Sequence, residues 1–321
     1  MSRALAVYLE PLNDYLADPT ISEICMNRPG ELFIEKGGSF ERVESPLLTK
    51  DHLIALANLI AEYNQKILSP QKPLLSGSLP TGERCQFILP PACDPHQLIV
   101  AIRKPSRGAL DLTDWFNDGL LATSQKESVL DELRQLQEKG HYAALLQKAI
   151  EAKCNLIISG GTSTAKTTFL NSCLRFIPHH ERLLTIEDTR ETQTIHSNTV
   201  HLLATSEDMS ASEAGVSMLD LLKVALRLRP DRIFLSELRG QQAYAFLRAA
   251  ISGHPGSITT LHADSIAHAK TQLRFMLAEA PELTHASTER LDALIHASVD
   301  VIIQMGREGA RRGPVDIAIK G

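Results

Sequence analysis

The first hundred residues alternate between short apolar runs and one longer amphipathic stretch. The short runs are rich in Ile, Leu, Phe and Val and end near turns that contain Gly or Pro, which predicts β-strands. Residues 49–65 start at a capping Thr and place apolar side chains on one side, which predicts a helix. We therefore expect a mixed α/β domain over residues 1–106. Its predicted strands occupy residues 21–26, 31–36, 85–90 and 98–103.

The pattern changes twice further along the chain. Residues 107–150 are polar with helical spacing, and Gly108, Gly119 and Gly140 interrupt them, which predicts a linker that contains helices. After it, buried-looking apolar runs alternate with helical patterns, which predicts a mostly parallel sheet with crossover helices. We expect this second domain over residues 151–321. Its predicted strands include residues 155–159, 182–187, 232–237, 256–261 and 299–304.

The composition limits the surroundings and partners of the chain. There is no run of about eighteen uncharged apolar residues, and acids interrupt the opening residues where a signal peptide needs an apolar core, so we expect a cytoplasmic chain. Five cysteines without CxxC spacing predict reduced packing residues. A formal net charge of -5 predicts no general affinity for a polyanion, so we expect protein partners and no direct specific nucleic-acid binding.

Residues 154–174 have the order strand, small-residue loop, Lys-Thr and helix that a phosphate-binding loop requires. In such a loop, successive backbone N–H groups and the helix N-terminus face the anion. Lys166 is then placed to reach the β- and γ-phosphates of ATP, and the hydroxyl of Thr167 to bind Mg²⁺. The predicted nucleotide-binding residues here are Gly160, Gly161, Thr162, Ser163, Thr164, Ala165, Lys166, Thr167 and Thr168.

One position departs from the pattern GxxxxGK[ST], because Ala165 replaces the second glycine. Alanine loses the close approach between backbone and phosphate that glycine allows. A loop that binds nucleotide weakly or not at all is therefore one alternative. A chance strand, loop and helix without any ligand is the other.

Acidic residues close two of the predicted strands. Glu187 and Asp188 end the strand at residues 182–187, and Glu237 follows the apolar run at residues 232–235. Because ligands of open α/β sheets bind at the carboxyl ends of the strands, these carboxylates can position Mg²⁺ or the attacking water. We assign Asp188 and Glu237 to Mg²⁺ and give Glu237 a role in orienting or deprotonating water. A helix cap, a solvated turn or an exposed strand-end acid is the alternative.

His254 and His262 flank the predicted strand at residues 256–261. An imidazole at such a place can sense the γ-phosphate by hydrogen bonding and couple it to the sheet. A structural or solvent-facing role is the alternative, and it is the preferred interpretation of His254.

Together, four segments resemble the Walker A, Asp box, Walker B and His box of the secretion ATPase superfamily. In chain order they are GGTSTAKTT, TIEDTRE, LRLRPDRIFLSELRG and SGHPGSITTLHA. The amino-terminal half adds the matching segments ISEICMNRPGE, LPTGERCQFILPP and VAIRKPS. The resemblance covers nearly the whole chain and is strongest to the hexameric traffic ATPases of type IV secretion and conjugation.

This resemblance implies an N-terminal α/β domain joined to a RecA-like P-loop C-terminal domain, with six copies in a homohexameric ring and ATP between the two domains. It implies that Lys166 and Thr167 bind phosphate and Mg²⁺, that Glu187 and Glu237 are catalytic, and that His262 is the sensor. Relatives have glycine at the positions of Ser163 and Ser236.

The resemblance also implies that Arg84 and Arg103, on two predicted strands of the N-terminal domain, act on the nucleotide, with Arg229 as a third candidate. Ordinary surface arginines paired with nearby acids are the alternative. The linker is similar to that of members in which the C-terminal domain packs against a neighbour's N-terminal domain. The unswapped arrangement stays open.

The implied function is a motor that couples ATP binding and hydrolysis to substrate translocation or pilus assembly. The implied partners are inner-membrane secretion-channel components and other secretion ATPases, with peripheral contact at the cytoplasmic face of the inner membrane. A docking ring with little or no ATP turnover, because of Ala165, is the alternative. A recombinase or helicase is disfavoured, since aromatic residues make up only 5% of the chain and no basic stripe alternates with them.

Overall fold

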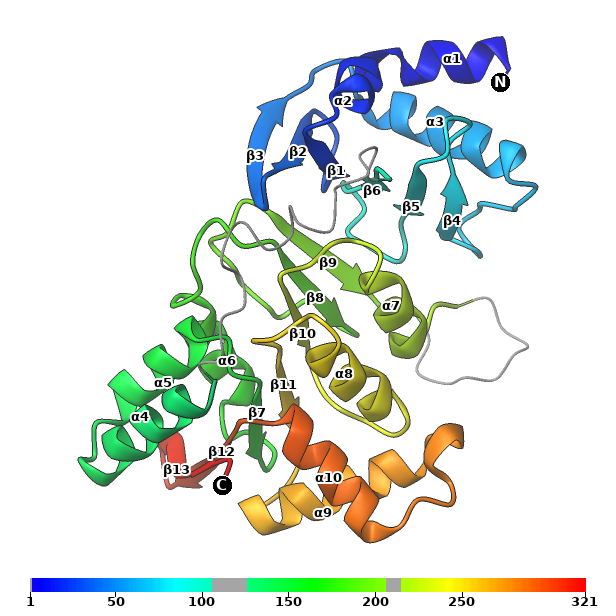
Figure 1. The fold of residues 1–321 in the computed structure, drawn as a ribbon. Coiled ribbons are helices and arrows are strands. Elements are labelled where there is room, and N and C mark those ends of the chain that lie inside the picture. The colour runs from blue at the N-terminus through cyan, green and yellow to red at the C-terminus, as the bar shows by residue number, and fades with distance from the viewer. Residues whose placement is uncertain (1, 106–125, 206–214) are drawn as a thin grey trace, which may run out of the picture.

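The computed structural model describes residues 2–105, 126–205 and 215–321. It contains two β-sheets that are covered by helices. The N-terminal sheet and its helices form one end of the molecule, and two helices from the last quarter of the chain, α9 (Ile266–Ala278) and α10 (Thr288–Ser298), form the other end (Figure 1). Within the described ranges, no helix is long and apolar enough to cross a membrane.

The N-terminal sheet has six strands in the order β3-β2-β1-β6-β5-β4. All of its neighbouring pairs are antiparallel. The strands are β1 (Ile21–Met26), β2 (Glu31–Lys36), β3 (Ser39–Glu44), β4 (Leu74–Ser78), β5 (Arg84–Ile88) and β6 (Ile99–Arg103).

The two faces of this sheet have different neighbours because successive side chains of a strand point to opposite sides. Ile24 and Met26 of β1 pack under the N-terminal helices, whereas Cys25 packs toward the second sheet. The predicted cap of the longest helix is confirmed, since the Thr49 hydroxyl accepts the His52 N–H. The helices are α1 (Arg3–Leu9), α2 (Asn13–Ala17) and α3 (Lys50–Tyr63), with the 3-10 turn η1 (Glu10–Leu12) between the first two.

The second sheet has seven strands in the order β13-β12-β7-β11-β10-β8-β9. Every pair is parallel except β12 with β13. This confirms the predicted parallel sheet. The strands are β7 (Leu156–Gly160), β8 (Leu183–Glu187), β9 (Thr199–Leu203), β10 (Arg232–Leu235), β11 (Ile258–Leu261), β12 (Val301–Glu308) and β13 (Arg311–Ile319).

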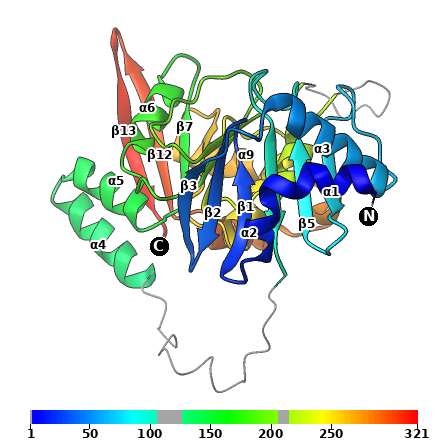
Figure 2. The same cartoon turned by 90° about the horizontal axis from the view of Figure 1, so that it is seen from above.

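Helices cover both faces of this sheet, as parallel strands require when they are buried on two sides. Leu156 and Ile158 of β7 pack with α4 to α6, whereas Ile157 packs with α7 to α10. Figure 2 shows α4 and α5 beside β12 and β13. The helices not yet given are α4 (Lys126–Glu138), α5 (Tyr142–Glu151), α6 (Lys166–Leu174), α7 (Met218–Ala225) and α8 (Gln242–Ile251), and the 3-10 turn η3 (Pro281–Leu283) follows α9.

Two helices of the predicted linker pack on the second sheet. Leu133 of α4 and Leu145 of α5 share a buried core with β7 and β12, and the Gln137 side chain donates to the Ile317 carbonyl oxygen at 2.7 Å. Residues 107–125 lie outside the described residues. The limits of the three predicted segments therefore stay a prediction.

The two sheets meet along β9, the edge strand of the second sheet. At one end of β9, the Leu203 N–H donates to the Ala92 carbonyl oxygen at 3.0 Å. At the other end, the Asn27 amide donates to Asn198 Oδ1 at 3.1 Å. One apolar core continues from the first sheet into the second, so the N-terminal part packs directly on the edge of the parallel sheet.

Candidate functional site

The parallel strands β7, β11, β10 and β8 bring their carboxyl ends to one edge of the second sheet. The predicted phosphate loop leaves β7 at this edge. Gly160 is required there by packing, because a Cβ at this position would lie 2.5 Å from Thr164 Oγ1 and 2.9 Å from Met305 Cβ. The Thr164 hydroxyl donates to the Gly161 carbonyl oxygen at 2.9 Å. The loop thus turns tightly over the end of the strand.

Two residues of this loop have left-handed backbones. Ser163 has φ of 61° and Ala165 has φ of 67°. Side chains in this region cost about 1–2 kcal/mol that glycine does not. In the described part of the chain, the backbone N–H groups of residues 162–167 donate to no acceptor. Backbone N–H groups without acceptors at the start of a helix suit an anion, as in a phosphate-binding loop.

Lys166 lies over the loop that it follows. Its ammonium donates to the carbonyl oxygens of Gly160 at 2.9 Å and Gly161 at 3.1 Å. Burial lowers the pKa of this ammonium, and the negative charge of Glu237 opposes that shift. Both of these partners are neutral carbonyl groups, which leave the charge of the lysine available for a phosphate.

A chain of charged side chains runs from Lys166 along the strand ends. The Lys166 Nζ lies 3.5 Å from both ring nitrogens of His262, and His262 Nε2 lies 3.2 Å from Glu237 Oε1. Arg239 donates to the other Glu237 oxygen at 2.6 Å and lies 3.4 Å from Asp188 Oδ2. The fold therefore brings together Lys166, His262, Glu237 and Asp188, which are far apart in the sequence.

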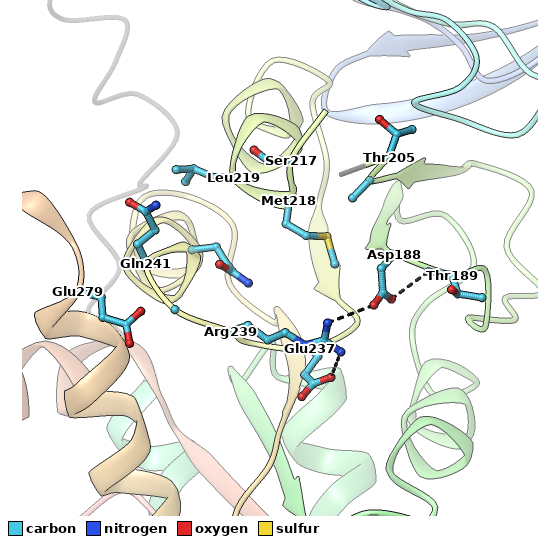
Figure 3. A pocket seen from close by; sticks show the side chains of 13 residues that line it. Asp188, Thr189, Thr205, Ser217, Met218, Leu219, Glu237, Arg239, Gln241 and Glu279 are labelled. Carbon is cyan, nitrogen blue, oxygen red and sulfur yellow. Dashed lines mark hydrogen bonds and ion pairs between the residues drawn. The ribbon is translucent and has the colours of Figure 1, made fainter. Parts of the chain in front are cut away.

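Figure 3 shows the cleft of about 670 Å³ that begins beside Glu237. Arg239 lies between Glu237 and Asp188 on its floor, and Glu279 stands on the opposite wall (Figure 3). The rest of the lining is mostly hydroxyl and amide groups. A mixed cleft of this kind, with more acids than bases, suits a polar ligand and its counter-ions.

Glu187 occupies a different environment from Glu237. Its side chain has no exposed area, whereas 18% of the Glu237 side chain is exposed. One Glu187 oxygen accepts the N–H groups of Glu191 at 3.0 Å and Thr192 at 2.7 Å, and the other accepts the Thr185 hydroxyl at 3.0 Å. The predicted catalytic role of Glu187 is untested, but its carboxylate shapes the turn after β8 and does not face the cleft.

Oxygen donors for Mg²⁺ are present at the same edge. Thr167 is half-buried at the start of α6, and Asp188 is more than a third exposed at the end of β8. Hydroxyl and carboxylate oxygens are the ligands that Mg²⁺ prefers, usually together with phosphate oxygens and water. No cluster of three or more His, Cys, Asp or Glu residues that could hold a metal occurs among the described residues. The donors fit a Mg²⁺ ion that arrives with a nucleotide.

The two histidines lie at opposite ends of β11. His262 follows its carboxyl end and joins the charged chain, whereas His254 precedes its amino end. The His254 Nδ1 lies 3.0 Å from the Pro230 carbonyl oxygen, and burial lowers the pKa of its ring. This environment agrees with a structural histidine.

The three arginines predicted to act on nucleotide gather at the amino edge of the second sheet, away from the loop. Arg84, Arg103 and Arg229 line one groove of about 880 Å³. Arg229 also pairs with Glu35 and, at 2.9 Å, with Asp231. Arg229 precedes β10 and Lys166 follows β7, so the length of a strand, roughly 15 Å, separates the two edges. Within one chain, these arginines and the loop do not form one site.

Two further arginines belong to the site, and sequence reasoning gave them no role. Arg239 joins Glu237 to Asp188, and Arg190 links Glu187 at 3.8 Å to Asp94 of the N-terminal part at 2.9 Å. Each stands two or three positions after a strand-end acid. That spacing was the available signal, because a cation there can reach back to the acid across the turn.

Comparison with known proteins adds to this geometry. The profile of the type II/IV secretion system protein family matches residues 6–309. The chain belongs to this family. The matched span runs from helix α1 to the tip of the β12–β13 hairpin, so it includes the whole first sheet and every strand of the second sheet except β13.

Two family members illustrate the likeness. The type IV secretion system protein PtlH of Bordetella pertussis is 39% identical over 319 residues, which cover 97% of this chain and 93% of that protein. The type IV secretion system protein VirB11 of Brucella suis is 37% identical over 95% of this chain and 87% of that protein. The crystal structure of the VirB11 ATPase from the Brucella suis type IV secretion system in complex with sulphate has a TM-score of 0.90 and 34% identity, and the match covers 98% of this chain and 94% of that chain.

Proposed function

We propose that this chain is a P-loop ATPase that uses ATP and Mg²⁺ and acts as a motor of a type IV secretion or conjugation machine. The observation that carries the proposal is the alignment of Lys166, His262 and Glu237 beside a loop whose N–H groups lack acceptors. The relatives named as type IV secretion system proteins support the assignment of this chain to such a machine.

The loop and the start of α6 hold the phosphates in this proposal. The free N–H groups of residues 162–167 face the anion, and Lys166 exchanges the carbonyl oxygens of Gly160 and Gly161 for β- and γ-phosphate oxygens. Thr167, Asp188 and Glu237 supply the oxygen donors for Mg²⁺, which neutralises phosphate charge when bound.

Glu237 orients the attacking water and accepts its proton. Arg239 occupies one Glu237 oxygen at 2.6 Å, so this arginine must turn away before the carboxylate can act. His262 lies between Lys166 and Glu237 and is placed to register the γ-phosphate. Glu187 is the competing base, but its three hydrogen bonds favour a role in holding the turn after β8.

Arg84 and Arg103 act in trans, on the phosphate loop of a neighbouring copy in a homohexameric ring. They lie a strand length from their own loop, and they face each other directly across β5 and β6. Like charges directly opposite are unfavourable in a sheet unless an anion joins them. A neighbour's nucleotide placed at this groove provides that anion, and the guanidinium groups neutralise charge in the transition state.

A mixing experiment tests this arrangement. Lys166→Ala chains lack the loop cation, and Arg103→Ala chains lack the donor on the opposite edge. When the two are co-expressed, sites that combine an intact loop with an intact neighbouring arginine are restored, at about one quarter of all interfaces in a randomly mixed ring. ATP turnover no greater than that of the two separate variants would exclude action in trans.

A docking ring with little turnover is the second candidate, and the methyl group that Ala165 places in the phosphate loop is the observation that favours it. Phosphate release by the purified full-length chain distinguishes the two functions. A motor releases phosphate at a rate that Lys166→Ala abolishes. A docking ring assembles but releases none with either chain.

The proposed partners are inner-membrane secretion-channel components and other secretion ATPases, met at the cytoplasmic face of the inner membrane. Substrate transfer in cells that lack this chain provides the test. The intact chain restores transfer, whereas Lys166→Ala does not. Equal restoration by both would show that the machine needs the chain but not its ATP chemistry.

A further inference from the structure

A row of charged side chains crosses the N-terminal sheet on the face that meets the second sheet. Glu23 on β1 stands directly opposite Glu35 on β2 and, on its other side, opposite Arg103 on β6. Arg103 in turn stands opposite Arg84 on β5. Alternation along β1 puts Glu23 on the same side as Cys25, which packs toward the second sheet. All four charged residues line one groove, and Arg229 also lines it.

Glu23 is the unusual member of this row. Only 3% of the residue is exposed, yet its carboxyl group has no hydrogen-bond partner among the described residues. Arg84 and Arg103 are exposed and form no ion pair with any residue that the structure describes. The carboxyl group therefore lies beside Arg103 without being fixed by it, and Arg84 stands one strand further along.

The surroundings of Glu23 favour its neutral form. Burial raises the pKa of this carboxyl to about 7, against the attraction of Arg103. The remaining charges that face it come from three other elements and act in both directions. They are Glu35 on β2, which raises the pKa further, and Arg182 before β8 and Arg229 before β10, which lower it.

The charge of Glu23 decides what the arginine pair offers to an anion. An ionised Glu23 attracts Arg103 and repels an approaching phosphate. A protonated Glu23 does neither. A phosphate that binds Arg84 and Arg103 adds negative charge beside Glu23, so binding raises the affinity of the carboxylate for a proton.

We propose that Glu23 is a positioning residue of the arginine half-site, and that it takes up one proton from solvent when Arg84 and Arg103 engage a nucleotide phosphate. This rests on the proposed function, because the phosphate is that of ATP bound to a neighbouring copy. Nucleotide binding is then linked to pH through a residue that touches neither the nucleotide nor the phosphate loop.

Calorimetric titration of the full-length chain with a non-hydrolysable ATP analogue at pH 6 and pH 8 tests the proposal. Other groups of the protein and the nucleotide contribute to the pH dependence, so the measured quantity is the difference between wild type and Glu23→Gln, which imitates the protonated carboxyl. The two proteins bind equally at pH 6. At pH 8, where a group of pKa about 7 is about nine-tenths ionised, Glu23→Gln binds up to about tenfold more tightly.

Two further measurements complete the design: the number of protons taken up on binding, and the effect of Glu23→Gln in a chain that also carries Arg103→Ala. Titration in buffers of different ionisation enthalpy shows proton uptake by wild type near pH 8 that Glu23→Gln lacks. The effect of Glu23→Gln disappears in an Arg103→Ala background, whereas a merely structural change persists there. The exposed Glu41→Gln on β3 is the matched control and keeps the wild-type pH profile.

The outcomes separate the two levels of inference. Parallel pH profiles of wild type and Glu23→Gln, with measurable binding, overturn the role of Glu23 and leave the ATPase intact. Absence of binding by both proteins at both pH values overturns the proposed function and this inference with it.

Discussion

Replacing Ala165 by glycine separates the strain of the phosphate loop from its affinity for nucleotide. Ala165 has φ of 67° and ψ of 33° immediately before α6, and its methyl group is attached between the N–H groups of residues 165 and 166. An anion that contacts both of these groups must approach the methyl group. Glycine removes that obstacle without requiring a new backbone path.

The expected change in stability is small because two terms oppose each other. Glycine relieves about 1–2 kcal/mol of left-handed strain, and it makes the unfolded chain more flexible by about 0.4–1 kcal/mol. The net gain lies between about 0 and about 1.6 kcal/mol, which is at most a few degrees in Tm for a chain of this size. The strain exists with and without ligand, so it contributes little to affinity.

The expected change in affinity is larger. Each charge-assisted hydrogen bond that the methyl group prevents is worth about 1.5–3 kcal/mol. Recovery of one such bond tightens Kd for ATP by roughly ten- to hundredfold, since about 1.4 kcal/mol corresponds to a factor of ten. Ala165→Gly should therefore raise affinity strongly and Tm only slightly.

Ser163→Gly is the matched control. Ser163 has φ of 61° in the same loop, but its side chain is exposed. Its replacement gives a similar change in Tm and less than about threefold in Kd. Calorimetric titration of the three proteins measures the affinities, and thermal unfolding measures Tm. Equal nucleotide affinity of Ala165→Gly and wild type would refute the argument that the methyl group obstructs phosphate.

Three further predictions concern single side chains. Lys166→Ala abolishes ATP turnover while Tm stays within a few degrees, because among the described residues the ammonium contacts only loop carbonyls and His262. Turnover equal to wild type would contradict a catalytic loop. Glu237→Gln binds ATP but hydrolyses it at least about a hundredfold more slowly, since the amide cannot accept the proton of water. A wild-type rate in a phosphate-release assay would shift the role of general base to Glu187. Burial, with a smaller contribution from Arg190, lowers the pKa of His201 to about 3. The stability that its neutral ring contributes is therefore complete above about pH 6.5 and is lost as pH falls toward 3. Thermal unfolding from pH 7 to 4 should show a smaller decrease in Tm for His201→Gln than for wild type.

The strands that the sequence indicated are those buried on both sides or carrying continuous apolar runs, such as β1, β7 and β8. Four strands were not among the named runs: β3, β4, β9 and β13. β3 is exposed along most of its length, and β13 contains Gly313 and Pro314, so neither has the apolar pattern of a buried strand. Pairing with a neighbour fixes these edge strands, and pairing is not visible in a local pattern.

The sequence by itself determined the chemistry of the phosphate loop and the presence of acids at strand ends, because these depend on residues within a few positions of one another. Tertiary structure decided which of those acids faces the cleft: Glu187 is enclosed by backbone N–H groups, whereas Glu237 lies beside His262 and Arg239. It also decided that Arg84 and Arg103 lie at the edge opposite Lys166. The physical reason is that the order of strands in a sheet and the edge on which the N-terminal part packs arise from long-range burial of apolar surface, which residue spacing along the chain does not encode.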